Sequence, residues 1–145
     1  MGAVGSNERV FDFSNNASND NIAITRSENT NSFHFSIWNS ASSCLITSIS
    51  ASLVQDARLT VLATYNSGDM TIKLRVGNNV PTSQVCTART ERTISLTYVG
   101  KSAWSDSYLS GSIAGLYAVD ALLTEPEIVV VISRMNAGED TLQAC

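Results

Sequence analysis

The sequence of 145 residues contains little charge. Only 15% of its residues are Asp, Glu, Lys or Arg, against about a quarter in ordinary globular domains. Serine, threonine and asparagine take the place of the missing lysine and glutamate. Exposed helix surfaces are usually built from strong helix formers such as Lys and Glu, so this composition favours strands and polar loops.

Positive charge and long apolar runs are also scarce. The nine Lys and Arg residues are dispersed and the formal net charge is −4, so the basic surface that nucleic acids and anionic membranes attract is missing. The longest apolar run, residues 128–132, is far shorter than the ~20 residues needed to span a bilayer. The first residues lack the charged and apolar regions of a signal peptide. We therefore expect no nucleic-acid partner and no membrane insertion.

Cysteine is limited to three residues, which leaves at least one unpaired. Cys44 and Cys86 pair if the protein is secreted, and the alternative is two buried free thiols. A metal site built on cysteine is disfavoured, because there is no C-x-x-C spacing and His34 is the only histidine. Cys145 is the last residue, and we expect it to belong to a segment that continues in a longer chain.

The length is that of a single domain. We expect the domain to occupy residues 10–135. Residues 1–9 are predicted to be a flexible lead-in or a cloning remnant, and residues 136–145 a tail that leads to a following domain.

Alternating apolar and polar side chains predict several short strands. In residues 32–38, Phe33, Phe35 and Ile37 alternate with polar neighbours. A turn at 66–69 joins two more such segments into a hairpin. Regularly spaced short strands indicate an all-β sandwich or barrel. The strands are expected at 10–13, 22–24, 32–38, 44–53, 58–65, 70–76, 93–99 and 113–119.

One segment carries a helix signal. Thr124 and Glu127 have the spacing of a capping box, with Pro126 in the first turn. The β-branched run at 128–132 prefers a strand. We therefore expect a short helical turn at about 124–127 that leads into a strand.

Residues 95–128 read SLTYVGKSAWSDSYLSGSIAGLYAVDALLTEPEI. This segment resembles the closing part of laminin-G-like modules, which belong to the concanavalin A-like lectin/glucanase superfamily. The resemblance extends at the level of pattern over most of residues 10–128. The strongest matches are Val99-Gly100, Trp104-Ser105-Asp106, Tyr108, Gly111, Ile113, Leu116-Tyr117 and residues 123–128.

The resemblance implies an antiparallel β-sandwich of the jelly-roll type. It also implies an extracellular or cell-surface location and makes calcium the candidate cofactor, with Asp106 as the candidate metal ligand. The sequence departs from the family's pattern at two places: residues 55–58 lack its W-x-H motif, and residues 74–77 replace its Y-V-N-G turn.

Catalytic side chains are hard to find. Glycoside hydrolysis needs two facing carboxylates, and no predicted strand carries two on one face. Glu125 and Glu127 come closest, but they flank Pro126 at a helix start, where capping is the simple interpretation. His34 lies on a predicted strand and is interpreted as structural. We therefore expect a protein that is not an enzyme.

The most suggestive group consists of Trp104, Asp106 and Tyr108. An aromatic ring stacks on the apolar face of a sugar, while a carboxylate accepts hydrogen bonds from its hydroxyls. The alternative is that the two aromatic rings pin the loop to the sandwich. Pinning is favoured for Tyr108, and both alternatives stay open for Trp104.

The function expected from these features is that of a non-catalytic recognition module, binding glycan or protein in adhesion, within a larger extracellular or surface protein. The alternative is a structural or assembly β-sandwich of a fibre, appendage or coat, which self-associates and has no small-molecule ligand.

Overall fold

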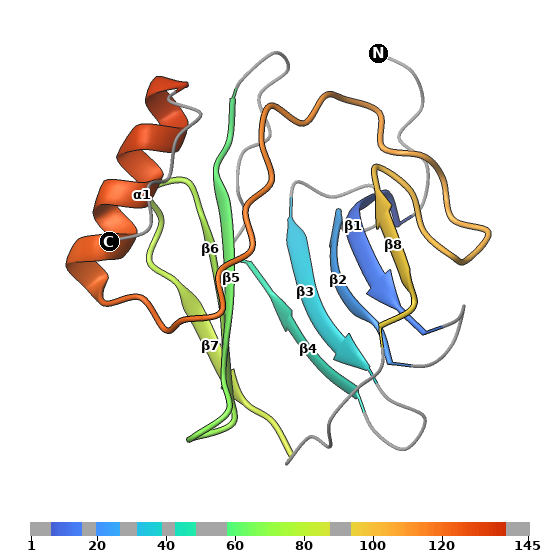
Figure 1. Ribbon diagram of the computed structural model, residues 1–145, viewed down its shortest axis with the longest axis horizontal. Coiled ribbons are helices and arrows are strands. Elements are labelled where there is room, and N and C mark those ends of the chain that lie inside the picture. The colour runs from blue at the N-terminus through green and yellow to red at the C-terminus, as the bar shows by residue number, and fades with distance from the viewer. Residues whose placement is uncertain are drawn as a thin grey trace.

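A computed structural model describes residues 7–15, 20–26, 32–38, 43–48, 58–87 and 94–138. Within them the protein has eight strands in two antiparallel sheets, followed by one helix. The two sheets face each other, and the helix lies outside the smaller one (Figure 1). The predicted all-β sandwich is confirmed, whereas the jelly-roll connectivity stays a prediction. No helix in the described ranges is long and apolar enough to cross a membrane.

The larger sheet has five strands in the order β4-β3-β2-β1-β8. Strands β1 to β4 follow one another as a meander, and β8 returns from far along the chain to pair with β1. The inner face is apolar because residues 33, 35 and 37 of β3 all point into the sandwich and are buried. The strands are β1 (Arg9–Ser14), β2 (Ile22–Arg26), β3 (Phe33–Trp38), β4 (Ser43–Thr47) and β8 (Leu96–Val99).

The smaller sheet has three strands in the order β5-β6-β7, which are β5 (Val61–Asn66), β6 (Thr71–Val76) and β7 (Thr82–Val85). The predicted hairpin is confirmed as β5 and β6. Its turn is fixed by side chains, since Asn66 Oδ1 accepts from the Gly68 N–H and Asp69 Oδ1 from the Thr71 N–H. Strand β7 was not predicted, because its sequence TSQV shows no apolar alternation.

The core lies between the sheets and is formed mainly by β3, β4 and β6. Ile72, Leu74 and Val76 of β6 are at most 2% exposed. Cys44 of β4 and Cys86, just after β7, form a buried disulfide with 5.7 Å between their Cα atoms. The predicted Cys44–Cys86 pairing is therefore confirmed, and it joins the two sheets along one side of the sandwich. Cys145 lies outside the described residues.

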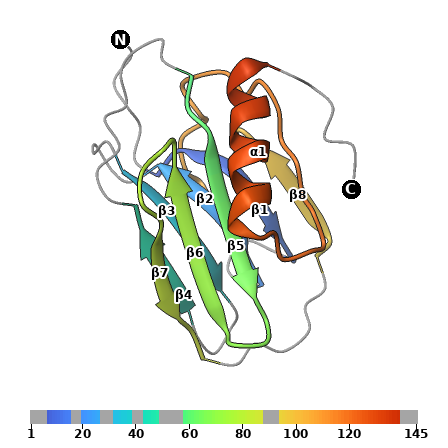
Figure 2. The ribbon, with the colours of Figure 1, turned by 90° about the vertical axis from the view of Figure 1, so that its left-hand side faces the viewer.

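Helix α1 (Glu125–Ala137) covers the outer face of the three-stranded sheet, as Figure 2 shows. The predicted capping box is present: the Glu127 carboxylate accepts hydrogen bonds from the Thr124 backbone N–H and hydroxyl, both at 2.7 Å. Ile128 and Ile132, four residues apart, are buried. The helix ends at Gly138, which adopts a left-handed conformation with φ 78°.

The expected strand after residue 127 is wrong, because residues 128–132 continue the helix. The cap fixes the start of the helix, and the spacing of Ile128 and Ile132 gives it an apolar stripe to bury. This tertiary packing outweighs the weak preference of β-branched residues for strands, which amounts to a fraction of a kcal/mol per residue.

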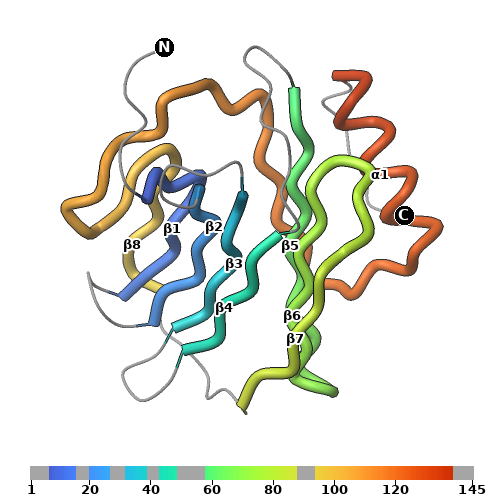
Figure 3. The backbone as a smooth tube through the Cα atoms, turned by 180° about the vertical axis from the view of Figure 1, so that it is seen from behind, coloured from blue at the N-terminus to red at the C-terminus, as the bar shows by residue number. Residues whose placement is uncertain are grey.

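The expected strand at 113–119 is also wrong. Residues 101–124 have no regular secondary structure and run along the side of the sandwich formed by β5 and β8 (Figures 1 and 3). Gly111 and Gly115 weaken strand formation, and Leu116, Tyr117 and Val119 are exposed rather than held in a sheet. The second half of the predicted strand 44–53 lies outside the described residues.

Candidate functional site

Residues 100–109 form a closed loop directly after β8. The Gly100 N–H donates to the Val10 carbonyl, and the Leu109 N–H donates back to the Gly100 carbonyl, both at 2.9 Å. Gly100 has a φ of 71°, a left-handed conformation that glycine adopts without strain. The base of the loop is therefore fixed to β1, and we name residues 100–109 the rim loop.

The rim loop folds over the outer face of the five-stranded sheet, where Arg9 holds it. Arg9 Nε and Nη2 both donate to Asp106 Oδ2, at 3.0 and 2.9 Å. Arg9 Nη1 donates to Thr25 Oγ1 at 2.9 Å. The two charged side chains are only 11% and 16% exposed, so solvent screens this ion pair less than it screens a surface pair.

A β-bulge explains why Arg9 reaches this face. The register of β1 on β2 shifts between Arg9 and Phe11. Such a shift places a side chain on the face opposite to the one that simple alternation predicts. No local sequence pattern indicates the bulge, so Arg9 is not among the candidate residues of the sequence analysis. Its partner lies 97 residues away, beyond the reach of any local pattern.

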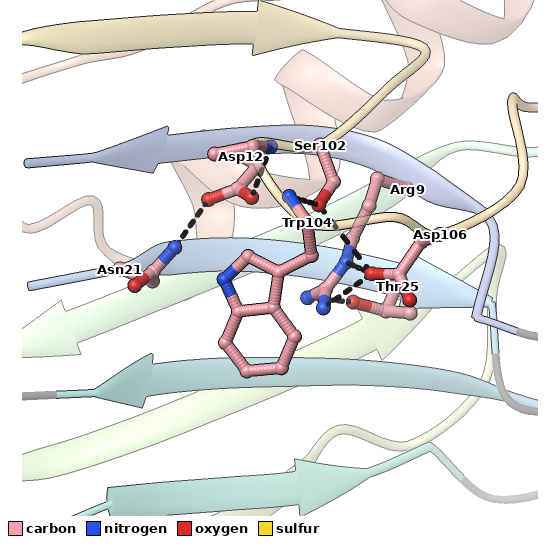
Figure 4. A network of polar contacts seen from close by, with 8 residues as sticks. Arg9, Asp12, Asn21, Thr25, Ser102, Trp104 and Asp106 are labelled. Atoms are coloured by element: carbon pink, nitrogen blue, oxygen red, sulfur yellow. Dashed lines mark hydrogen bonds and ion pairs between the residues drawn. The ribbon is translucent and has the colours of Figure 1, made fainter. Parts of the chain in front are cut away.

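Trp104 packs into the same cluster. Its ring meets Trp38 of β3 edge-on, with centroids 5.6 Å apart, and the Arg9 guanidinium lies 5.1 Å from its centroid. The Trp104 backbone N–H donates to Ser102 Oγ at 2.7 Å. Figure 4 shows the indole lying over the strands of the sheet. Trp104 Nε1 is buried without a hydrogen-bond partner in the described structure.

A buried carboxylate lies beneath this loop. Asp12 of β1 is fully buried, and its oxygens accept hydrogen bonds from Asn21 Nδ2 at 2.9 Å and from the Ala103 N–H at 3.4 Å. Figure 4 shows the contact between Asp12 and Asn21. Alternation placed Asp12 opposite the core, but nothing in the sequence indicated that the rim loop would cover it.

Tyr108 differs from the rest of the loop because its side chain is 73% exposed. The favoured interpretation, that Tyr108 pins the loop to the sandwich, is therefore not what the structure has. Arg9, Asp106 and Trp104 hold the loop instead, and this arrangement leaves the Tyr108 ring facing solvent. The structure thus brings Trp104 and Asp106 together through Arg9 and presents Tyr108 outward from the same loop.

The other candidate residues have structural partners. Glu127 caps α1, and its pKa is lowered by the hydrogen bonds from the Thr124 side chain and backbone. Glu125 forms an ion pair with Arg75 at 2.7 Å. His34 of β3 lies opposite Thr25 of β2 and Thr47 of β4. Burial lowers its pKa, which favours the neutral ring at pH 7.

The donor set around Asp106 can be compared with what calcium needs. Calcium takes six to eight oxygen ligands, whereas Asp106 already faces the positive charge of Arg9. No group of three or more His, Cys, Asp or Glu side chains comes together in the part of the chain that the structure describes. As arranged, these residues do not fit a calcium ion, and calcium at Asp106 stays a prediction.

Comparisons with known proteins add no family. No protein-family model matches the chain, and neither curated proteins nor solved structures give a match.

Proposed function

We propose that this protein is a non-catalytic recognition module of a larger extracellular or surface protein and that it binds glycan or protein through the rim loop. The resemblance of residues 95–128 to laminin-G-like modules supports this proposal. The Cys44–Cys86 disulfide is compatible with an oxidising, extracellular location.

The observation that carries the proposal is the exposed ring of Tyr108 on a loop with a fixed base. An exposed aromatic side chain on a rigid loop offers a flat apolar surface at little entropic cost on binding. The hydrogen bonds of Gly100 and the Arg9–Asp106 ion pair supply that rigidity. Loops held by a rigid scaffold are also where binding residues are most often found.

The chemistry of the loop suits a hydroxyl-rich ligand. Tyr108 supplies the stacking surface. The contacts of Asp106 within the described residues all use Oδ2, which leaves Oδ1 to accept a hydrogen bond from a sugar hydroxyl. Trp104 supports the loop from below through Trp38 and Arg9, so in this proposal it positions the site rather than stacking on the ligand.

The absence of catalysis is part of the proposal. Hydrolysis of glycosidic bonds needs an acid and a nucleophile or base that both reach the substrate. Asp12 is fully buried and Asp106 is tied to Arg9, which supports binding without turnover.

A glycan array with the wild-type protein and Tyr108→Ala tests the proposal. If Tyr108 is the stacking anchor, the substitution weakens binding of any glycan hit by about tenfold to a hundredfold, as for aromatic hot spots. Tyr108→Phe keeps the ring and is expected to bind nearly as well. Because Tyr108 is mostly exposed, the melting temperature should hardly change.

A matched control is Tyr117→Ala, which removes an aromatic ring outside the rim loop. Equal loss of binding in both alanine variants, or unchanged binding in Tyr108→Ala, contradicts the proposed role of the loop. The second candidate function, a structural or assembly domain, is favoured by a separate observation: the edge strand β7 carries no charge and has no strand paired with its outer side among the described residues.

A further inference from the structure

Strand β7 forms one edge of the three-stranded sheet, and no other strand of the described chain pairs with its outer side. Figure 2 shows β7 at the margin of the sheet, with β6 on its inner side. Its residues, Thr82-Ser83-Gln84-Val85, include no charged side chain. Natural edge strands are commonly protected by charge, above all by lysine, and that protection is missing from β7.

The backbone groups at the free edge can be assigned from the register. The Cys86 N–H donates to the Met70 carbonyl at 2.8 Å, and Gln84 pairs with Ile72 of β6. Antiparallel pairs alternate between those that exchange hydrogen bonds and those that do not. The residues at 82, 84 and 86 therefore bond to β6, whereas Ser83 and Val85 direct their N–H and C=O groups away from the sheet.

The two sides of the sandwich differ in what lies along their edge strands. The chain between β8 and α1 runs along the side formed by β5 and β8 (Figures 1 and 2). The opposite side consists of the edge strands β4 and β7, joined by the Cys44–Cys86 disulfide and by a hydrogen bond from Thr82 Oγ1 to the Thr47 carbonyl at 3.2 Å. These links hold β7 in place beside β4, and Ser83, Gln84 and Val85 are all exposed, so the strand is accessible to another strand.

We propose that β7 pairs in antiparallel fashion with β7 of a second copy of this chain, about a twofold axis at Gln84. Ser83 of each copy then exchanges two backbone hydrogen bonds with Val85 of the other, which uses all the outward groups of the strand. The Gln84 side chains meet across the axis, where the amide of one donates to the carbonyl of the other. The two three-stranded sheets become one continuous sheet.

A second copy fits this edge because the strand is complementary to itself. With no charge on β7, no like charges meet at the axis. Val85, which is 68% exposed in the single chain, comes within reach of Val85 of the second copy as a diagonal neighbour. Four residues make a short interface, so the dimer is weak, with a dissociation constant on the order of 10–100 μM.

Sedimentation equilibrium of the whole chain between about 5 μM and 1 mM tests the proposal across that range. We expect the average mass to rise from the 15.5 kDa of one chain towards twice that value. Val85→Lys places two positive charges diagonally across the axis and is expected to weaken the dimer about tenfold. The matched control, Val99→Lys, makes the same substitution in β8 at the far edge of the other sheet and should leave the dimer intact.

Two further variants test the register. Ser83→Pro removes an outward N–H without removing a bond to β6, so it should give a folded monomer. Gln84→Cys in a Cys145→Ser background should form a disulfide-linked dimer on mild oxidation, because the two Cβ atoms lie about 5 Å apart in such a pair. Asn78→Cys, at an exposed turn, is the control that should not cross-link.

A chain that stays monomeric at 1 mM overturns the proposal. So does a dimer that Val85→Lys and Ser83→Pro leave unchanged, because its interface would then lie elsewhere. Neither result bears on glycan binding, since the rim loop lies beside β8 at the other end of the molecule (Figure 1).

Discussion

The inner and outer faces of the five-stranded sheet are stabilised by different kinds of interaction. The inner face packs Phe35 and Ile37 against β6 in an apolar core, where the free energy comes from many non-directional contacts. The outer face under the rim loop is held by a few directional contacts that centre on Arg9, Asp12 and Asp106. The first arrangement tolerates substitutions of similar volume, whereas the second fails when one partner is removed.

The largest expected effect is on the inner face. Leu74→Ala should lower the free energy of unfolding by about 2–5 kcal/mol, because Leu74 is 1% exposed and its loss leaves a cavity. Leu74→Met, which nearly conserves volume, should cost less than about 1.5 kcal/mol. Urea unfolding measures both. A Leu74→Met variant as unstable as Leu74→Ala would show that this core depends on exact shape.

The Arg9–Asp106 ion pair on the outer face, unlike the core at Leu74, should not tolerate a substitution that conserves volume. Asp106→Ala leaves the mostly buried Arg9 guanidinium without its carboxylate and should cost roughly 2–3 kcal/mol, between the values for exposed and fully buried pairs. Asp106→Asn has nearly the same volume and should still destabilise, because the charge is lost. Urea unfolding of both variants separates charge from shape.

The Arg75–Glu125 ion pair is the matched control, because Glu125 is 60% exposed. Arg75→Ala should change stability by about 0–1 kcal/mol. If Asp106→Ala costs no more than Arg75→Ala, the rim loop is held by something other than its ion pair. The same variants, melted with calcium and with chelator, test the metal prediction: tight binding at Asp106 would raise the melting temperature of the wild type and of Arg75→Ala, but not that of Asp106→Ala.

The smallest effect concerns the start of α1. The pKa of Glu127 is lowered below its ordinary value of 4.5 by hydrogen bonds from Thr124. A lowered pKa in the folded state means that the stabilisation is fully present above pH 4.5 and is lost as the pH falls through the lowered value. Circular dichroism at 222 nm should show α1 fraying in that acidic range. Glu127→Gln should abolish this pH-dependent fraying of α1. Identical titration curves for the wild type and Glu127→Gln would contradict the role of the Glu127 carboxylate.

The sequence predicts the inner face well because alternation in β3 and β6 directly encodes burial. It predicts α1 only in part, since the signal of the cap at Thr124 was correct but the β-branched run after it suggested a strand. Residues 113–119 show the limit of alternation, which does not distinguish a paired strand from an extended segment without a neighbour.

The candidate site was predictable only where its residues are close in sequence. Trp104, Asp106 and Tyr108 share one short loop, so their spacing drew attention to them. Arg9 and Asp12 join them from 90 or more residues away, and a bulge decides which face Arg9 occupies. Arg9 itself carries no usable sequence signal, because it lies just before the first predicted strand, in the segment expected to be a flexible lead-in.

The Cys44–Cys86 disulfide also decides how the domain responds to mechanical force. The bond spans 42 positions in sequence, and that length of chain is excluded from stretching when the two ends of the domain are pulled apart. We expect helix α1, held mainly by Ile128, Ile132 and the Arg75–Glu125 pair, to detach early, while β4, β5, β6 and β7 stay within the covalent loop. Reduction of the disulfide makes about 140 Å of additional chain available for stretching. The redox state of this one bond therefore sets how far the unfolded domain can extend.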